Sequence, residues 1–112
     1  MSRTPSIQAR VRAEIDALYA ELEKSKREMN YDDMQKLPYL SRVITETLRL
    51  WPSVPNGTFR EFEHDDQIKG KGGKMVTIPK GIQVNIPVWL LHTSEELWGP
   101  TVEEFNPDRG EF

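Results

Sequence analysis

The sequence predicts an α+β chain that is mainly helical, with two longer helices, a small antiparallel sheet of about three strands, a short helix and a loop-like tail. Apolar residues recur at helical spacing over residues 5–24 and 38–50. Segments 58–62, 75–78 and 82–88 are short, rich in β-formers or alternating, and separated by turn residues. Proline and glycine lie mostly between these segments, which supports the division.

The composition limits the classes of protein that fit. With 112 residues, the chain is one domain's worth or a piece of a larger one, and we expect 1–112 to be a single partial domain. A net charge of −3 argues against a nucleic-acid partner. No apolar run approaches the roughly 20 residues of a membrane span, and no signal peptide is visible. There is no cysteine, so the chain has no disulfide and no thiolate ligand or nucleophile.

The first helix is expected over residues 5–24, with Thr4 as its cap and Pro5 at its first position. We expect it to be a packing helix without chemistry, followed by a solvated polar connector over 23–36 in which Asn30 or Asp32 caps a short turn. Its apolar stripe is Ile7, Val11, Ile15, Leu18 and Leu22, and its charged face is Arg10, Arg12, Glu14, Asp16 and Glu21.

The second helix lies between Pro38, which suits a first helical position, and Pro52, which ends it. Glu46 and Arg49 are three residues apart and share one flank. An exposed pair of this kind contributes about 0.2–0.5 kcal/mol, whereas a buried pair would fix how other segments pack. Twelve glutamates and eight arginines would give about one Glu-x-x-Arg by chance, so the spacing alone does not decide. The apolar face of this helix is Leu40, Val43, Ile44 and Leu48.

The second half predicts three strands and a short helix. Residues 58–62 and 82–88 alternate, with Pro87 at a strand end and His92 at the end of the last strand, while 75–78 is a short strand. Segments 63–66 and 70–73 are predicted as turns. Thr93 or Ser94 caps a helix over 95–98, and the tail from residue 105 is loop-like, ending on the apolar Phe112.

No motif with a self-contained mechanism is present. His64, Asp65 and Asp66 are a weak oxygen-rich metal candidate, for which a solvated acidic turn is the favoured interpretation. A hydrolase using His92 and Glu46 is a minor alternative. There is no P-loop, dinucleotide fingerprint or nucleophile elbow.

The order of the segments is more specific than any of them alone. Residues 7–22, the Glu-Thr-Leu-Arg-Leu helix ending at Pro52, an arginine-bearing strand, Ile-Pro-Lys-Gly, Trp-Gly-Pro and Phe-Asn-Pro-Asp-Arg follow one another along essentially the whole chain. This order resembles the cytochrome P450 family, with residues 7–22 similar to its J helix, the Glu46 segment to its K helix, and Phe105 and Pro107 in its meander motif.

The resemblance implies roles for particular residues. Glu46, Arg49 and Arg109 would form the family's structural triad, which supports the segment before the haem ligand. Arg60 would reach a haem propionate, with an exposed strand arginine as the alternative. The residues that would lie near the substrate are Val54, Asn56, Gly57 and Thr58.

The resemblance also implies haem as cofactor, insertion of one oxygen atom of O₂ into a small hydrophobic substrate, and an electron-donating reductase as partner. The axial cysteine is missing from the sequence, Gly110 and Glu111 interrupt the usual aromatic after Arg109, and the oxygen-activating helix would lie upstream. We therefore expect no catalytic or metal-ligating residue here, an inactive chain by itself, and the remainder of the fold as its partner. For an intact eukaryotic relative, the endoplasmic reticulum membrane is expected. The alternative is a non-catalytic interaction module that docks through its first helix.

Overall fold

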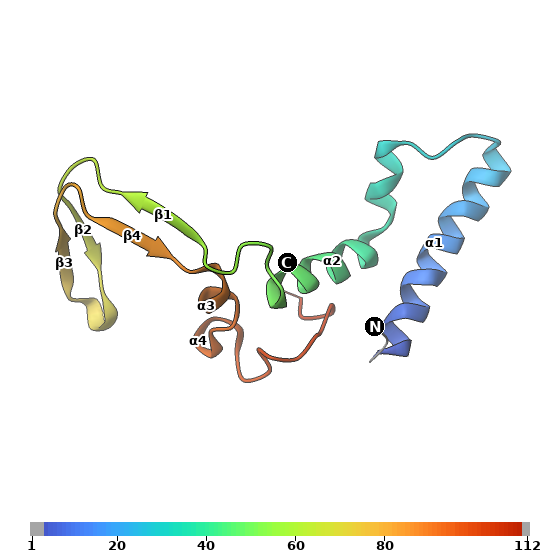
Figure 1. Cartoon of the computed structure of the whole chain (residues 1–112). Helices are drawn as coiled ribbons and strands as arrows, with labels where there is room; N and C mark the ends of the chain where they lie inside the picture. The colour runs from blue at the N-terminus through green and yellow to red at the C-terminus, as the bar shows by residue number, and fades with distance from the viewer. Residues whose placement is uncertain (1–3, 111–112) are drawn as a thin grey trace. The chain divides into compact units, whose positions relative to one another are not determined.

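The computed structural model describes residues 4–110, which form two compact units. One unit comprises the described residues up to Leu48 and those from Glu104 onward, and the other is Arg49–Glu103. Helices and short strand pairs make up the chain, which confirms the predicted α+β class (Figure 1). The elements are α1 (Pro5–Ser25), η1 (Tyr31–Lys36), α2 (Pro38–Leu50), β1 (Thr58–Glu61), β2 (Asp66–Lys69), η2 (Lys71–Gly73), β3 (Met75–Ile78), β4 (Gln83–Ile86), α3 (Val88–His92) and α4 (Glu95–Trp98).

Helix α1 begins at Pro5 as predicted and continues one residue beyond the expected end. Thr4 occupies the N-cap position, but its side chain makes no capping hydrogen bond. The predicted stripe provides the hydrophobic core of the first unit, where Leu18 and Leu22 are buried against Leu37. The helix ends because Lys26 adopts a left-handed conformation at φ +50°, and its amide bonds back to the last turn.

The connector after α1 is not simply solvated surface, which corrects the prediction. Asn30 caps η1 in a capping box with Asp33, whose side chain is only 2% exposed. The Arg27 guanidinium donates to both carboxylate oxygens of Asp33 at 2.6 and 2.5 Å. This hydrogen bonding, with the amide of Asn30, lowers the pKa of Asp33 well below its usual range.

The N-terminus of α2 is capped from a distance. Glu14 of α1 accepts hydrogen bonds from the amides of Tyr39 and Leu40, both at 2.8 Å. Glu14 was predicted to lie on the charged face of α1, and no partner was predicted for it. The first-turn amides of a helix have no partner within it, so a carboxylate from another segment serves as the cap.

Helix α2 buries charge rather than the full apolar face that was predicted. Ile44 and Leu48 are 51% and 48% exposed, whereas Glu46 and Arg49 are 0% and 2% exposed. The apolar face is thus half-exposed, and the Glu-x-x-Arg flank is the buried one.

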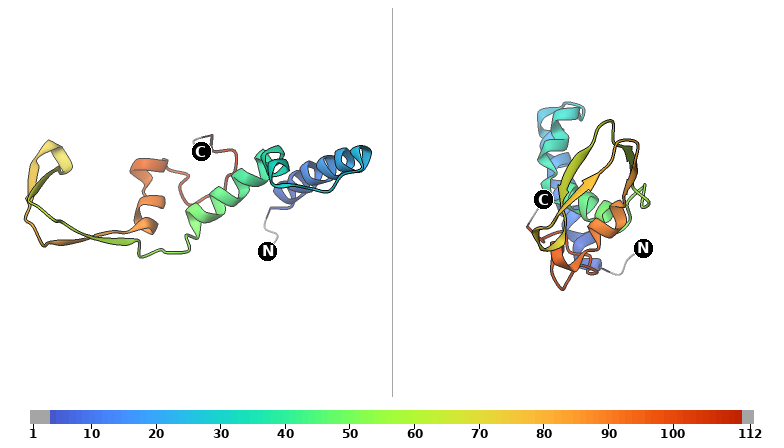
Figure 2. Two further views of the ribbon diagram at one scale, coloured as in Figure 1. Left: turned by 90° about the horizontal axis from the view of Figure 1, so that it is seen from above. Right: turned by 90° about the vertical axis from the view of Figure 1, so that its left-hand side faces the viewer.

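Residues 4–110 contain four strands in two antiparallel pairs instead of the predicted sheet of about three strands. Thr58 pairs with Ile86 in the β1–β4 ladder, and Asp66 pairs with Ile78 in the β2–β3 hairpin. The hairpin lies between β1 and β4 in the sequence and beyond the end of their ladder in space (Figures 1 and 2). The strand missed by the prediction is β2, because its sequence Asp-Gln-Ile-Lys contains one apolar residue and follows an acidic turn.

The segment after β4 also differs from the prediction. Residues 88–92 form the short helix α3, so His92 ends a helix and not a strand. Pro87 is the N-cap of that helix, where its missing amide hydrogen costs nothing. Helix α4 follows Ser94 as expected and ends at Gly99, whose φ is +79°.

The described part of the tail, up to Gly110, has no helix or strand, in agreement with the prediction. Glu111 and Phe112 lie outside the described residues. Among residues 4–110, no helix has the length and apolar character that crossing a bilayer requires.

Replacement of Glu14 should loosen the start of α2. We expect Glu14→Ala to destabilise the first unit by about 1–2 kcal/mol, because two first-turn amides lose a charged acceptor. Amide hydrogen exchange of Tyr39 and Leu40 is the measurement, and both should exchange faster. Asp16→Asn is the control, because Asp16 is an exposed acid of the same helix. Equal exchange in both variants would contradict the capping role.

Candidate functional site

A buried carboxylate of α2 meets the tail within the first unit. Glu46 is fully buried, and its Oε1 accepts the amide hydrogen of Asn106 at 2.9 Å. The same oxygen lies 3.6 Å from Nε of Arg109, whose side chain is 7% exposed. Nη2 of Arg109 also donates to the carbonyl of Glu104 at 3.0 Å. The tail is therefore tied to α2 by an ionic contact and a main-chain hydrogen bond.

Asp108 forms a second attachment of the tail, which the sequence analysis missed. Its carboxylate accepts from Arg10 of α1 at 2.8 Å and from Arg42 of α2 at 3.2 Å. Arg10 also stacks over the ring of Tyr39, 3.9 Å from its centroid. These side chains are 40–53% exposed, so the ion pairs add orientation more than stability. No sequence signal separates Asp108 from any other exposed loop acid.

The motif's other two residues pack beneath these polar contacts. Pro107 is fully buried and Phe105 is half-buried. Asn106 Oδ1 accepts the amide of Asp108 at 3.0 Å, which makes a local Asx-type turn. The Phe-Asn-Pro-Asp-Arg segment is thus a shaped loop, held at every residue by packing or hydrogen bonds.

Arg49 is the third residue of the predicted triad, and it lies on the same helix as Glu46, three positions further on. In the second unit, its Nη1 donates to the carbonyl of His92 at 2.9 Å. Its guanidinium carbon also lies 5.2 Å from the ring of Trp98. His92 itself faces the carbonyl of Arg49 through Nδ1, so the histidine is engaged by the end of α2.

The predicted substrate-proximal residues form the turn that leads into β1. The amide of Gly57 donates to the carbonyl of Val54 at 3.0 Å, and the Pro55 carbonyl accepts from the Trp89 amide at 3.1 Å. Val54 and Asn56 are exposed, and Thr58 is half-buried as the first residue of the strand. The turn thus presents two free side chains on a firmly held backbone.

Gly57 is the position of this turn at which no other residue fits. Its φ is +79°, and a Cβ built there would lie 1.7 Å from the carbonyl oxygen of Ile86. The backbone of the turn consequently approaches β4 more closely than any side chain would allow.

Arg60 projects from the middle of β1 and is exposed. Within residues 4–110, its guanidinium makes no hydrogen bond or ion pair with another side chain. A planar guanidinium in this state fits an anionic carboxylate such as a propionate. The donor chemistry at this position is therefore compatible with the predicted role.

No metal-ligating cluster is assembled in the part of the chain that the structure describes. The Asp65 carboxylate accepts the amide of Lys80 at 2.8 Å, and Asp66 accepts the amide of Gln67 at 2.7 Å. Asp65 is thus engaged by the turn at Lys80, and Asp66 is engaged within β2.

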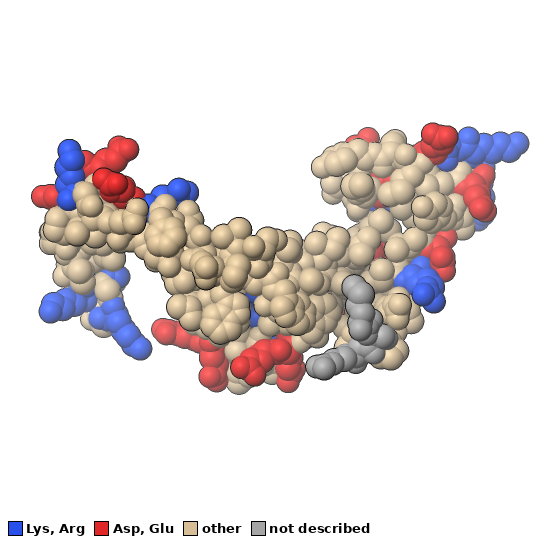
Figure 3. Space-filling model, viewed as in Figure 1, with Lys and Arg blue, Asp and Glu red and all other residues tan. Residues whose placement is uncertain are grey.

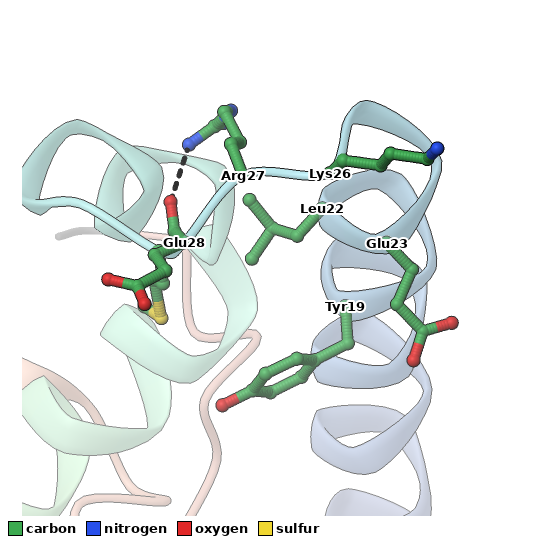
Figure 4. A pocket seen from close by; sticks show the side chains of 7 residues that line it. Tyr19, Leu22, Glu23, Lys26, Arg27 and Glu28 are labelled. Carbon is green, nitrogen blue, oxygen red and sulfur yellow. Dashed lines mark hydrogen bonds between the residues drawn. The ribbon is translucent and has the colours of Figure 1, made fainter.

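A surface pocket of about 470 Å³ lies where α1 ends and the connector begins (Figure 4). Tyr19 and Leu22 line it from the helix, and Arg27, Glu28 and Met29 line it from the connector. Arg27 Nη1 donates to the Glu28 carbonyl at 3.2 Å across its rim. None of the predicted site residues contributes to this pocket.

Comparison with known proteins identifies the family. The model of the cytochrome P450 family matches residues 1–109. The chain is 46% identical over 80 residues to the probable cytochrome P450 313a1 of Drosophila melanogaster, covering 71% of this chain and 15% of that protein. It is 38% identical over 105 residues to cytochrome P450 3A28 of Bos taurus, covering 94% of this chain and 18% of that protein.

A solved structure, that of the cytochrome P450 CYP102L1, has a TM-score of 0.78 and 36% identity, covering 97% of this chain and 23% of the solved one. The chain belongs to the cytochrome P450 family. The family's cofactor is haem, and its members are monooxygenases that work with redox partners. The chain spans less than a quarter of the length of these relatives.

Replacement of Gly57 by alanine should disrupt the start of the β1–β4 ladder. The left-handed φ costs about 1–3 kcal/mol for a non-glycine residue, and the contact with Ile86 adds to that. Hydrogen exchange of the β1 and β4 amides measures the loss. The matched control is Gly81→Ala, which has φ +81° but open space around its Cβ. A loss as large in Gly81→Ala as in Gly57→Ala would contradict the importance of the close approach.

Proposed function

We propose that this chain is a part of a haem-dependent monooxygenase that inserts one oxygen atom of O₂ into an organic substrate. Within that enzyme, its role is to support the haem-binding segment. The observation that carries the proposal is the fully buried carboxylate of Glu46, which accepts the Asn106 amide and lies 3.6 Å from Arg109. The two compact units described above would be parts of one domain in that enzyme.

The structural triad would be Glu46, Arg49 and Arg109. Glu46 and Arg49 lie on α2 with almost no solvent exposure, and Arg109 is 7% exposed. Burial of this kind is costly unless opposite charges and hydrogen-bond donors compensate it, and removal of one partner costs about 3–5 kcal/mol. The contacts of each group support a structural role: Glu46 lies beside Arg109 and the Asn106 amide, and Arg49 donates to the His92 carbonyl.

Haem would be held in part by Arg60, through a propionate. The exposed guanidinium on β1 has the charge and donor geometry for a carboxylate. When bound through a cysteine thiolate, haem supplies the oxygen-activating chemistry of the family. The sequence as printed contains no cysteine, so the iron ligand would have to come from outside these 112 residues.

The substrate would be met by the turn before β1. Val54 and Asn56 are exposed there, while Gly57 and Thr58 fix the backbone. An exposed aliphatic side chain next to an amide suits a small hydrophobic substrate with a polar group.

The partners would be the remainder of a cytochrome P450 fold, a reductase and the substrate. Several large apolar side chains of the second unit are exposed, and the surface over α3 carries little charge (Figure 3). Such residues would be covered in a complete fold. The relatives from Drosophila melanogaster and Bos taurus are eukaryotic proteins, which favours the endoplasmic reticulum membrane for the parent enzyme. The exposed residues are Trp51, Val54, Trp89, Leu90, Leu91 and Leu97.

The printed chain by itself should not form a thiolate-ligated haem. Purified chain mixed with haem, reduced and exposed to carbon monoxide should lack the thiolate-type absorption band, because no cysteine is available. The bovine relative, assayed alongside, should show the band. A thiolate-type band from the chain alone would contradict the proposal that it is an inactive part.

A chimera tests the supporting role. In CYP102L1, the matching segment is replaced by residues 1–109 of this chain, and the thiolate-type carbon monoxide band reports correctly held haem. We expect the chimera to retain the band. In its Glu46→Ala variant, the band should be at least about tenfold weaker, because loss of the carboxylate leaves buried donors unpaired.

Glu103→Ala is the control, since Glu103 is an exposed acid near the tail. An unchanged band in the Glu46→Ala chimera would overturn the supporting role. Loss of the band in the parent chimera itself would count against the proposed function.

A further inference from the structure

His92 and Arg49 form a reciprocal contact that the triad does not include. Nη1 of Arg49 donates to the His92 carbonyl at 2.9 Å, and Nδ1 of His92 lies 3.2 Å from the Arg49 carbonyl. Arg49 is the penultimate residue of α2 and His92 is the last residue of α3. The side chain of each residue therefore reaches a carbonyl at the end of the other residue's helix.

Both carbonyls need such a partner. The last four carbonyls of a helix have no acceptor role within it. After α2 the chain passes through Trp51 to Pro52, and a proline has no amide hydrogen to donate back. In α3, which has five residues, Trp98 Nε1 donates to the Leu91 carbonyl at 2.9 Å, beside the carbonyl that Arg49 occupies. The two helix ends are thus completed by side chains.

The contact also determines where the imidazole proton lies. A carbonyl oxygen only accepts hydrogen bonds, so Nδ1 must carry a hydrogen. In neutral His92 this is the Nδ1–H tautomer, with the lone pair on Nε2, and in the imidazolium form Nδ1 also donates. The hydrogen bond to Arg49 is therefore made in both protonation states.

We propose that His92 is a positioning residue for Arg49. The Nδ1–H of His92 donates to the carbonyl of Arg49, and the main-chain carbonyl of His92 accepts from the Arg49 guanidinium. Together these bonds fix the C-terminal end of α2 and the direction of the Arg49 side chain. Trp98 completes the arrangement, because its ring lies 5.2 Å from the guanidinium carbon while its Nε1 holds α3. The importance of this position for haem rests on the proposed function, whereas the contact itself does not.

The unmodified chain gives the first test, without haem. Long-range ¹H–¹⁵N correlation of the imidazole distinguishes the two neutral tautomers. We expect neutral His92 to be in the Nδ1–H form. The Nε2–H form would overturn the proposal, and this measurement requires no variant to fold.

Three substitutions then separate the donor atom from the bulk of the ring. In His92→Asn, the side-chain amide occupies the place of Nδ1, whereas in His92→Gln it occupies the place of Nε2. His92→Phe keeps the ring and has no donor. The measured quantity is the exchange rate of the Arg49 guanidinium hydrogens with solvent.

We expect His92→Asn to exchange within about twofold of the unmodified chain, and His92→Gln and His92→Phe to exchange at least about tenfold faster, as loss of one hydrogen bond predicts. Equal rates in all three variants, fast or slow, would overturn the proposal, since a merely structural ring would not distinguish asparagine from glutamine. The carbon monoxide band of the chimera tests the proposed function separately, so the two failures are distinguishable.

Discussion

The buried carboxylate of Glu46 is the constraint on which the first unit depends. It has no contact with solvent, and its position beside Asn106 and Arg109 ties a loop without secondary structure to a helix about 60 residues earlier in the chain. A charge in that position is stable only while its donors stay in place, so helix and loop constrain each other. A hydrophobic contact would attach the loop but would not fix its register.

A carboxylate that accepts backbone amide hydrogens is also found where the chain passes from one element to the next. Glu14 accepts two amides at the start of α2, Asp33 accepts the amide of Asn30 at the start of η1, and Asp65 accepts the amide of Lys80 between β3 and β4. At helix C-terminal ends the sign is reversed, because His92 donates to a carbonyl of α2. At the starts of α2 and η1 the partner is an acid, and at the end of α2 it is a hydrogen-bond donor, as the helix dipole favours.

Local pattern predicted the elements whose stabilising contacts are near in sequence. The stripe of α1, the two prolines around α2 and the alternation of β1 were sufficient because each follows from spacing of 3.6 or 2 residues. β2 was missed because one isoleucine among polar residues gives no period, and its partner β3 is what makes it a strand. The last strand was predicted over 82–88 with His92 at its end, because Val-Trp-Leu-Leu-His continues an apolar run that fits either a strand or a helix.

The site shows a sharper limit of the same kind. Glu46 and Arg49 could be selected from the sequence only because the order of motifs along the chain resembles a known family, since the four-residue pattern arises by chance. Glu14, Asp33 and Asp108 had no such order to mark them, and each looked like an ordinary surface acid. What distinguishes them is the partner, which lies 3 to 98 residues away in the contacts described here.

The apolar side chains of α2 are exposed because its charged flank is the one that is buried. Its Glu-x-x-Arg flank is committed to polar partners, which leaves Ile44 and Leu48 about half-exposed on the remaining surface. A helix whose polar flank is buried and whose apolar flank is open is reversed relative to an ordinary surface helix. The buried ionic contact then determines the orientation of the helix, because only one rotation about its axis satisfies Glu46.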